Sequence, residues 1–182
     1  MSVEISTTHP TRLLTAARSK RLRIASCYAS WIADHEWHVA LTLNFDSGVS
    51  RYAAVQAARI YWQRLDVDLF GNNAVARRKT RLPRACFIEG EAGVRNWHYH
   101  AAVQLPVADS CRWDAALVGS PQRFGDVLVE RWKAMREAGR FSKAEPIYDA
   151  AGWATYISKD AGKGDCDLCT STSHFTCNSD TM

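Results

Sequence analysis

The chain has 182 residues, of which 47% are hydrophobic and 23% are charged. These proportions are close to the average of folded globular proteins, so they exclude global disorder and suit one domain rather than two. The 23 lysines and arginines exceed the 19 acidic residues and give a net charge of +4, which permits a polyanionic partner without requiring one.

Residues 1–36 are expected to form a basic N-terminal segment that contains a helix. From 10 to 34 the sequence has no strong helix breaker after Pro10 and mixes leucine, alanine and arginine. Four basic residues gather in this segment: Arg18, Lys20, Arg21 and Arg23. The main domain is expected over 37–163.

A strand and a second helix open that domain. Hydrophobic residues alternate with others from Trp37 to Phe45, which is typical of a half-buried strand. Ser50 can cap a following helix whose hydrophobic residues recur at helical spacing, and Gly71 stops it.

A basic cluster comes next. It crowds five cations into eight positions: Arg77, Arg78, Lys79, Arg81 and Arg84. Such clusters attract the phosphates of nucleic acids, although a solvated loop has the same composition. We expect these residues to bind DNA, with a solvated loop as the alternative.

Two further strands are predicted on either side of the glycines in 90–96. The first runs from Ala85 to Glu89, and the second alternates from Trp97 to Leu105 before Pro106 ends it. One face of the second strand is aromatic and aliphatic, and the other carries the histidines. The pattern predicts an antiparallel hairpin with a histidine face.

The rest of the domain alternates between helix and strand. An amphipathic helix that begins near Phe124 and is closed by Gly139 should cover the aromatic face of the sheet. Residues 141–148 predict a strand that Pro146 confines to an edge, and Asp149 can cap a last helix with a buried Trp153 and Ile157 stripe. These elements predict an α+β fold with a central antiparallel sheet.

His98 and His100 are separated by one residue on a predicted strand, so both imidazoles project from one face. Glu89 lies on the adjoining strand and is our preferred third ligand, with Glu91 as its rival if the strand continues past Gly90. Two imidazoles and one carboxylate suit Mn²⁺ or Mg²⁺ acting as a Lewis acid on a phosphoryl oxygen.

Tyr156 and Lys159 share one face of the last helix, because they are three positions apart. A tyrosine can act as a covalent nucleophile if a nearby cation favours its phenolate, and Lys159 could be that cation. Gly152, one turn earlier, is expected to leave room for a substrate.

Three segments in this order resemble the motifs of the HUH endonucleases: LTLNF, HYHAAVQLP and WATYISK. LDVDLFG and FIEG add to a likeness with the small replication initiators of rolling-circle plasmids and filamentous phages. The resemblance covers about residues 37–163, and the HYH and YxxK pair is its most specific part. It implies an RRM-like or ferredoxin-like antiparallel sheet of about five strands flanked by helices.

The resemblance also implies a function. The residues that match His98, His100 and Glu89 bind the divalent metal in that family. The tyrosine that matches Tyr156 attacks a phosphodiester of single-stranded DNA, leaving a 5′-phosphotyrosine and a free 3′-hydroxyl, and the lysine that matches Lys159 assists. The chain would then be a single-tyrosine replication initiator that nicks and rejoins DNA at an origin.

Alternatives with other biological roles stay open. A single-tyrosine transposase or a relaxase would use the same nicking step, and a DNA-binding regulator would use the basic residues without catalysis. The expected partners are single-stranded DNA or an origin hairpin, together with a host helicase and polymerase. No apolar run of ~18 residues and no export signal occur, so we expect no membrane partner and a cytoplasmic location in a bacterial host.

The tail over 164–182 is polar and rich in serine, threonine and cysteine. Its potential zinc ligands have the spacing C-x2-C-x4-H-x2-C: Cys166, Cys169, His174 and Cys177. The last spacing is two residues shorter than in a zinc knuckle. We therefore favour an unstructured tail over a zinc site.

Overall fold

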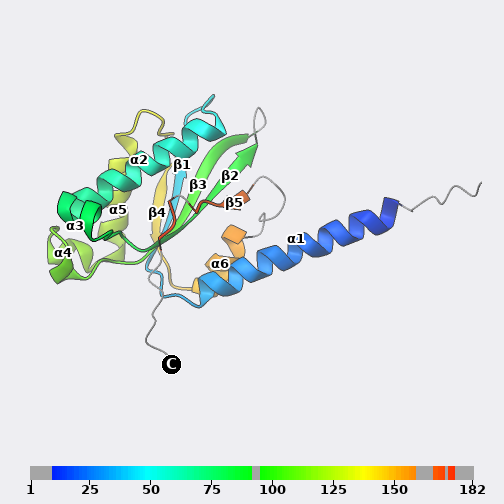
Figure 1. The fold of residues 1–182 in the computed structure, drawn as a ribbon, viewed down its shortest axis with the longest axis horizontal. Helices are drawn as coiled ribbons and strands as arrows, with labels where there is room; N and C mark the ends of the chain where they lie inside the picture. Colours follow the sequence, from blue (N-terminus) through cyan, green and yellow to red (C-terminus); the bar gives the residue numbers. More distant parts are fainter. Residues whose placement is uncertain (1–9, 92–94, 159–165, 171, 175–182) are drawn as a thin grey trace, which may run out of the picture.

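The computed structural model describes residues 10–91, 95–158, 166–170 and 172–174. A five-stranded sheet with the order β4-β1-β3-β2-β5 forms its centre (Figure 1). All neighbouring strands are antiparallel. The strands are β1 (Val39–Asn44), β2 (Arg84–Glu91), β3 (Arg95–Val103), β4 (Lys143–Pro146) and β5 (Cys166–Leu168). The predicted α+β class is confirmed.

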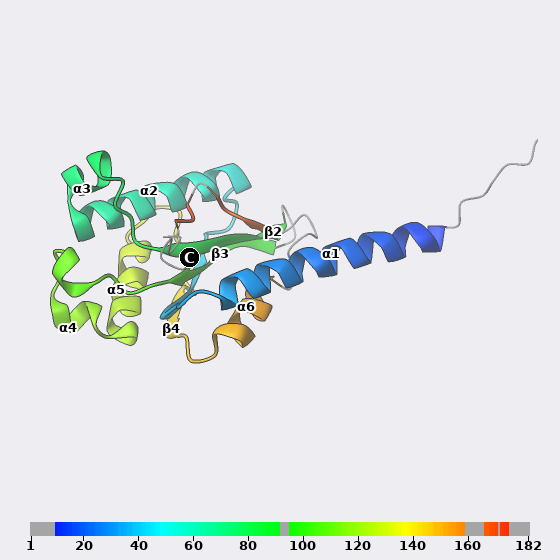
Figure 2. The ribbon, with the colours of Figure 1, turned by 60° about the horizontal axis from the view of Figure 1, so that its bottom comes forward.

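Helices cover both faces of the sheet, as Figure 2 shows from a second direction. The helices are α1 (Pro10–Ala33), α2 (Arg51–Phe70), α3 (Asn72–Arg77), α4 (Ala115–Val118), α5 (Pro121–Lys133) and α6 (Ala150–Ser158). Residues of α2 and α5 pack on one face, and residues of α1 and α6 pack on the other. Within the described residues, no helix has both the length and the apolar character that crossing a membrane requires.

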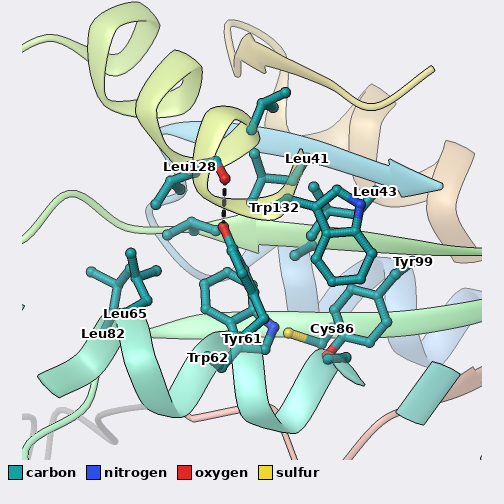
Figure 3. Packing of buried hydrophobic residues seen from close by; sticks show 14 of the residues in the cluster. Leu41, Leu43, Tyr61, Trp62, Leu65, Leu82, Cys86, Tyr99, Leu128 and Trp132 are labelled. Carbon is teal, nitrogen blue, oxygen red and sulfur yellow. Dashed lines mark hydrogen bonds between the residues drawn. The ribbon is translucent and has the colours of Figure 1, made fainter. Parts of the chain in front are cut away.

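The larger core lies between the sheet and the α2 and α5 pair (Figure 3). Leu41, Leu43 and Tyr99 point from the strands toward Trp132 of α5. The buried hydroxyl of Tyr61 donates a hydrogen bond of 2.9 Å to the carbonyl of Leu128, which joins the two helices. This core contains the alternating residues that predicted the first strand, so the predicted inward face is confirmed.

A smaller core forms on the histidine face. Phe87 and Ala102 of the strands pack with Ile32 of α1 and with Ala154 and Ile157 of α6. Burial of these apolar side chains, worth about 25 cal/mol per Å² of surface, holds both helices against the sheet. The α6 helix begins after Asp149, whose carboxylate accepts a 2.9 Å hydrogen bond from the Gly152 amide, as expected for its cap.

At two predicted boundaries a glycine has another role than the one expected. The α5 helix ends at Lys133 rather than at Gly139. A Cβ at Gly139 would lie 2.6 Å from the carbonyl oxygen of Phe45, so this glycine allows the chain to pass close to β1. Strand β2 continues through Gly90 to Glu91, with a register irregularity and a φ of 150° at Gly90.

The expectation of an unstructured tail over 164–182 is wrong for its described part. Strand β5 pairs with β2, and the Cys169 amide then donates a 2.7 Å hydrogen bond to the carbonyl of Cys86. Thr172 and Ser173 are buried, and the Ser173 hydroxyl accepts from the Cys86 amide. Backbone pairing with an open strand edge orders this polar segment, which has little apolar surface of its own.

A buried ion pair connects α2 with the start of β2. Asp66 is fully buried, and its carboxylate accepts hydrogen bonds of 2.9 and 3.0 Å from the Arg84 guanidinium. The same carboxylate accepts from the Leu82 amide, and Arg84 also donates to the carbonyl of Thr172. One arginine therefore links a helix, a strand and the C-terminal segment.

We predict that Asp66→Ala lowers the free energy of unfolding by about 3–5 kcal/mol, because it leaves Arg84 buried without its counter-charge. Asp68→Ala on the same helix is the control, since the Asp68 and Arg131 pair is solvent-exposed and worth no more than about 1 kcal/mol. Urea titration followed by circular dichroism measures both variants. Equal, small losses for the two would contradict the structural importance of the buried pair.

Candidate functional site

Glu89, His98 and His100 come together on the α1 and α6 face of the sheet. The register places Glu89 opposite His98, and Phe87 opposite His100, on the paired strands β2 and β3. One ligand atom from each of the three residues lies within 4.8 Å of the others. Glu89 and His100 are buried, whereas the His98 side chain is 24% exposed and leaves one side of the group accessible.

The two imidazoles face different oxygens of one carboxylate. The Nε2 atom of His100 lies 3.5 Å from Oε2 of Glu89, and Nε2 of His98 lies 3.8 Å from Oε1. These separations exceed the ordinary length of a strong hydrogen bond. A cation that binds between the three groups could therefore coordinate all of them.

Neighbouring groups orient both rings. Nδ1 of His98 lies 3.0 Å from the carbonyl oxygen of Asn96, and because a carbonyl can only accept, Nδ1 carries the proton. In the neutral ring Nε2 then has its lone pair directed at Glu89, as a metal ligand requires. Nδ1 of His100 lies 3.3 Å from Oγ1 of Thr42, its cross-strand neighbour on β1.

The carboxylate of this group is ionised at neutral pH. The neighbouring His100 and His98 imidazoles lower the pKa of Glu89 far below its usual range, and their effect outweighs the burial that raises it. An anionic oxygen ligand beside two imidazole nitrogens is a donor set that divalent metals accept. The group could therefore hold a metal ion, and its three members are the preferred ligands of the sequence analysis.

Tyr156 lies next to this group. Its ring centroid is 5.9 Å from that of His100, and the two rings meet edge to face at 84°. Ala154 and Ile157 anchor α6 in the smaller core, and this anchoring directs Tyr156 to the rim of the group, where 52% of its surface stays exposed. A buried helix face thus places a half-exposed tyrosine beside His100 of this group.

Several predicted residues cannot be placed with this group, or have another role. Lys159 lies outside the described residues. The backbone of Glu91 pairs with Arg95, but its side chain is also outside the described part. Gly152 was expected to leave room for a substrate, and this is wrong: a Cβ there would lie 2.3 Å from Oδ2 of Asp149, so the glycine accommodates the capping carboxylate.

Thr42 and Asn96 were missed as residues that orient the histidines. Thr42 could have been found from its alternation, because it lies on the polar face of the predicted first strand and that strand pairs with β3. Asn96 acts through its backbone carbonyl, and no side-chain pattern in a sequence reports that contact.

The basic cluster at 77–84 divides into two sets. Arg84 is buried in the Asp66 pair, so the prediction that its side chain binds DNA is wrong. Arg81 is bound to the same carboxylate at 3.4 Å and is 19% exposed. The remaining cluster residues are exposed at and after the end of α3, on the other side of the sheet from α6: Arg77, Arg78 and Lys79 (Figure 2).

The potential zinc ligands of the tail do not form one described group. Cys169 is buried in the larger core, and His174 pairs with Arg84 through its backbone on the α2 side of the sheet. The side chains of Cys166 and Cys177 lie outside the described residues. In the described ranges, the group of Glu89, His98 and His100 is the one set of three that could hold a metal.

We predict that His98→Ala and His100→Ala each weaken Mn²⁺ binding by at least about ten-fold, because each removes a nitrogen ligand. His38→Ala is the matched control, since His38 also faces a glutamate, Glu36, at 3.7 Å but belongs to no group of three potential metal ligands among the described residues. Isothermal titration calorimetry with MnCl₂ measures the affinities. Affinities that are unchanged in the first two variants would exclude this group as the metal site.

Comparison with protein-family models, curated proteins and solved structures gives no match. The candidate site is therefore argued from the geometry of this chain alone. On a confirmed α+β scaffold, that geometry brings an ionised carboxylate, two oriented imidazoles and an accessible phenol to one face of the sheet.

Proposed function

We propose that the protein is a metal-dependent endonuclease that nicks and rejoins single-stranded DNA, with Tyr156 as the nucleophile. The observation that carries the proposal is the contact between the Tyr156 ring and His100 of the candidate metal group. A phosphodiester near that group would be within reach of the phenol. The resemblance of the HYH and YxxK segments to HUH endonucleases supports DNA as the substrate.

The chemistry proceeds in one displacement. The Tyr156 phenol loses its proton, and its oxygen attacks phosphorus as the bond to the 3′ oxygen breaks. The DNA 5′ phosphate then remains on the tyrosine, and protonation of the leaving oxygen gives a free 3′-hydroxyl. Rejoining is the reverse displacement, in which a 3′-hydroxyl attacks the phosphotyrosine.

Three residues of the chain prepare the phosphate for this step. Glu89, His98 and His100 would hold Mn²⁺ or Mg²⁺, which supplies Lewis-acid polarisation of a phosphoryl oxygen when bound. The low pKa of Glu89 keeps its carboxylate anionic and ready to bind the cation at neutral pH. Lys159 is proposed, from the resemblance, to place a positive charge beside the same phosphate.

Helix α1 offers a path for the DNA strand. Its C-terminal part packs against the sheet, where Tyr28 meets Phe87 edge to face at 5.6 Å, and its N-terminal turns extend past the sheet (Figures 1 and 2). The sequence from Pro10 to Ala33 contains no acidic residue. An open pocket of about 450 Å³ lies against one face of this helix, lined by Lys20, Arg23, Ile24, Cys27 and Tyr28.

This combination suits a nucleic-acid strand. Cations attract the phosphates, and apolar and aromatic surface can contact the bases. Tyr28 lines this pocket and contacts Phe87, which lies across from His100 in the hairpin, so one end of the pocket is on the side of the candidate metal group. The exposed part of the 77–79 cluster is on the other side of the sheet and would contact a different part of a long substrate.

An origin replication initiator is the role that the resemblance favours, and a transposase or relaxase would use the same step. We predict that wild-type protein with Mn²⁺ and a single-stranded oligonucleotide carrying the origin sequence forms a covalent adduct that survives denaturing electrophoresis. Tyr156→Phe should abolish the adduct, because the ring remains but the nucleophilic oxygen is lost. Chelation of the metal should abolish it as well.

Tyr148→Phe is the control for that experiment, since Tyr148 is 92% exposed and should leave the adduct unchanged. An adduct that persists in Tyr156→Phe would exclude Tyr156 as the nucleophile. DNA binding by wild-type protein without any adduct would favour the non-catalytic regulator.

We predict that Lys20→Gln combined with Arg23→Gln weakens binding of single-stranded DNA. Loss of two phosphate contacts should reduce the slope of log affinity against log salt by about 1.4. Arg77→Gln combined with Arg78→Gln removes the same charge from the other face and should leave the affinity of a short oligonucleotide near wild type. Fluorescence anisotropy across a salt series measures both, and the reverse ranking would place the strand on the α3 face.

A further inference from the structure

A second polar pocket lies at the opposite end of β2 from the candidate metal group. It has a volume of about 250 Å³ and is formed where α2, the start of β2 and the C-terminal segment meet. Arg84 in its wall and Glu89 are five positions apart on the strand, which corresponds to about 17 Å. The pocket is therefore separate from the site proposed for DNA cleavage.

Its one acidic residue is already neutralised. The two oxygens of Asp66 accept hydrogen bonds from the Leu82 amide and from the Arg84 guanidinium, and Arg81 contacts them at 3.4 Å. Arg84 also covers the Trp62 ring, with its guanidinium carbon 4.5 Å from the ring centroid. Asp66 and Arg84 thus line the pocket as an ion pair whose charges offset each other.

The groups that remain are positive or hydrogen-bond donors. Arg59 is exposed at the pocket, and Arg81 uses Nη1 for the carbonyls of Val75 and Thr80, which leaves Nη2 without a described partner. Gln63 contributes an amide. Three guanidinium groups and one carboxylate line the pocket, so the lining carries an excess of positive charge.

His174 responds to the same environment. Burial is the main cause that lowers its pKa, and the charge of Arg84 lowers it further. At neutral pH its imidazole is therefore uncharged and offers one N–H donor to the pocket. An anion that enters would offset the neighbouring arginines and accept from this donor.

We propose that this pocket binds a phosphate group, gripped by Arg59 and Arg81 with His174 and Gln63 as additional donors. Guanidinium groups match phosphate oxygens in pairs of parallel hydrogen bonds, and an anion with several acceptor oxygens suits a lining rich in donors. The small volume suits a phosphate rather than a whole nucleotide. The site does not depend on the nicking chemistry.

The test is calorimetric titration of the full chain with inorganic phosphate, at constant ionic strength in chloride. Wild-type protein should bind saturably, and Arg59→Gln should weaken the affinity by about ten-fold. Arg64→Gln is the matched control, because Arg64 lies on the same helix but lines a different pocket and should leave the affinity unchanged. The imidazole NMR signals of His174 should shift with the same midpoint as the heat signal.

Absence of saturable phosphate binding would overturn the proposal, as would binding that is equally strong in Arg59→Gln and leaves the His174 signals unmoved. The source of the phosphate is decided by competition with a single-stranded oligonucleotide that lacks terminal phosphates. If the pocket binds backbone phosphates, the oligonucleotide displaces inorganic phosphate. If the pocket binds only free phosphate or a phosphate monoester, the oligonucleotide does not displace it. Both measurements can be repeated with the Tyr156→Phe variant, which lacks the proposed nucleophile. The phosphate result therefore does not depend on whether the nuclease proposal is correct.

Discussion

The antiparallel register of β2 with β3 is the constraint on which the rest of the structure depends. Side chains alternate between the faces of a strand, so one face of this hairpin carries Tyr99 into the larger core while the other presents Glu89, His98 and His100. A slip of one residue would exchange the faces and bury the imidazoles among aromatic rings. The hydrophobic core and the candidate metal group therefore stabilise the same register.

Helices α1 and α6, on the histidine face, pack against the sheet and also place residues of the candidate site. This face is apolar around Phe87 and Ala102, and without cover it would expose hydrophobic surface to water. Helix α6 covers part of it and thereby places Tyr156 beside His100, while α1 covers the rest and extends a cationic surface outward. Because Tyr156 lies at the rim of the group and is not fully buried, its phenol stays accessible to a substrate.

Local patterns predicted much of this arrangement. Alternation predicted the strands and the shared face of Glu89, His98 and His100, and the Ser50 and Asp149 caps predicted two helix starts. Contacts between distant residues were not predictable in this way. The Arg84 and Asp66 pair looks like ordinary surface charge in the sequence, because nothing local indicates that both residues are buried. The ordered structure of residues 166–170 and 172–174 depends on an open strand edge that only the assembled sheet provides.

The docking of the C-terminal segment has a consequence for synthesis of the protein. On the ribosome, β2 and β3 emerge long before Cys166–Leu168, so the outer backbone edge of β2 lacks this strand neighbour until Cys166–Leu168 have also been translated. An unpaired edge of this kind can join the strands of other nascent molecules. Pairing of the short strand β5 with β2 would then cover this edge. The edge stays open until β5 has been synthesised, but a strand of this length can pair quickly once it is available.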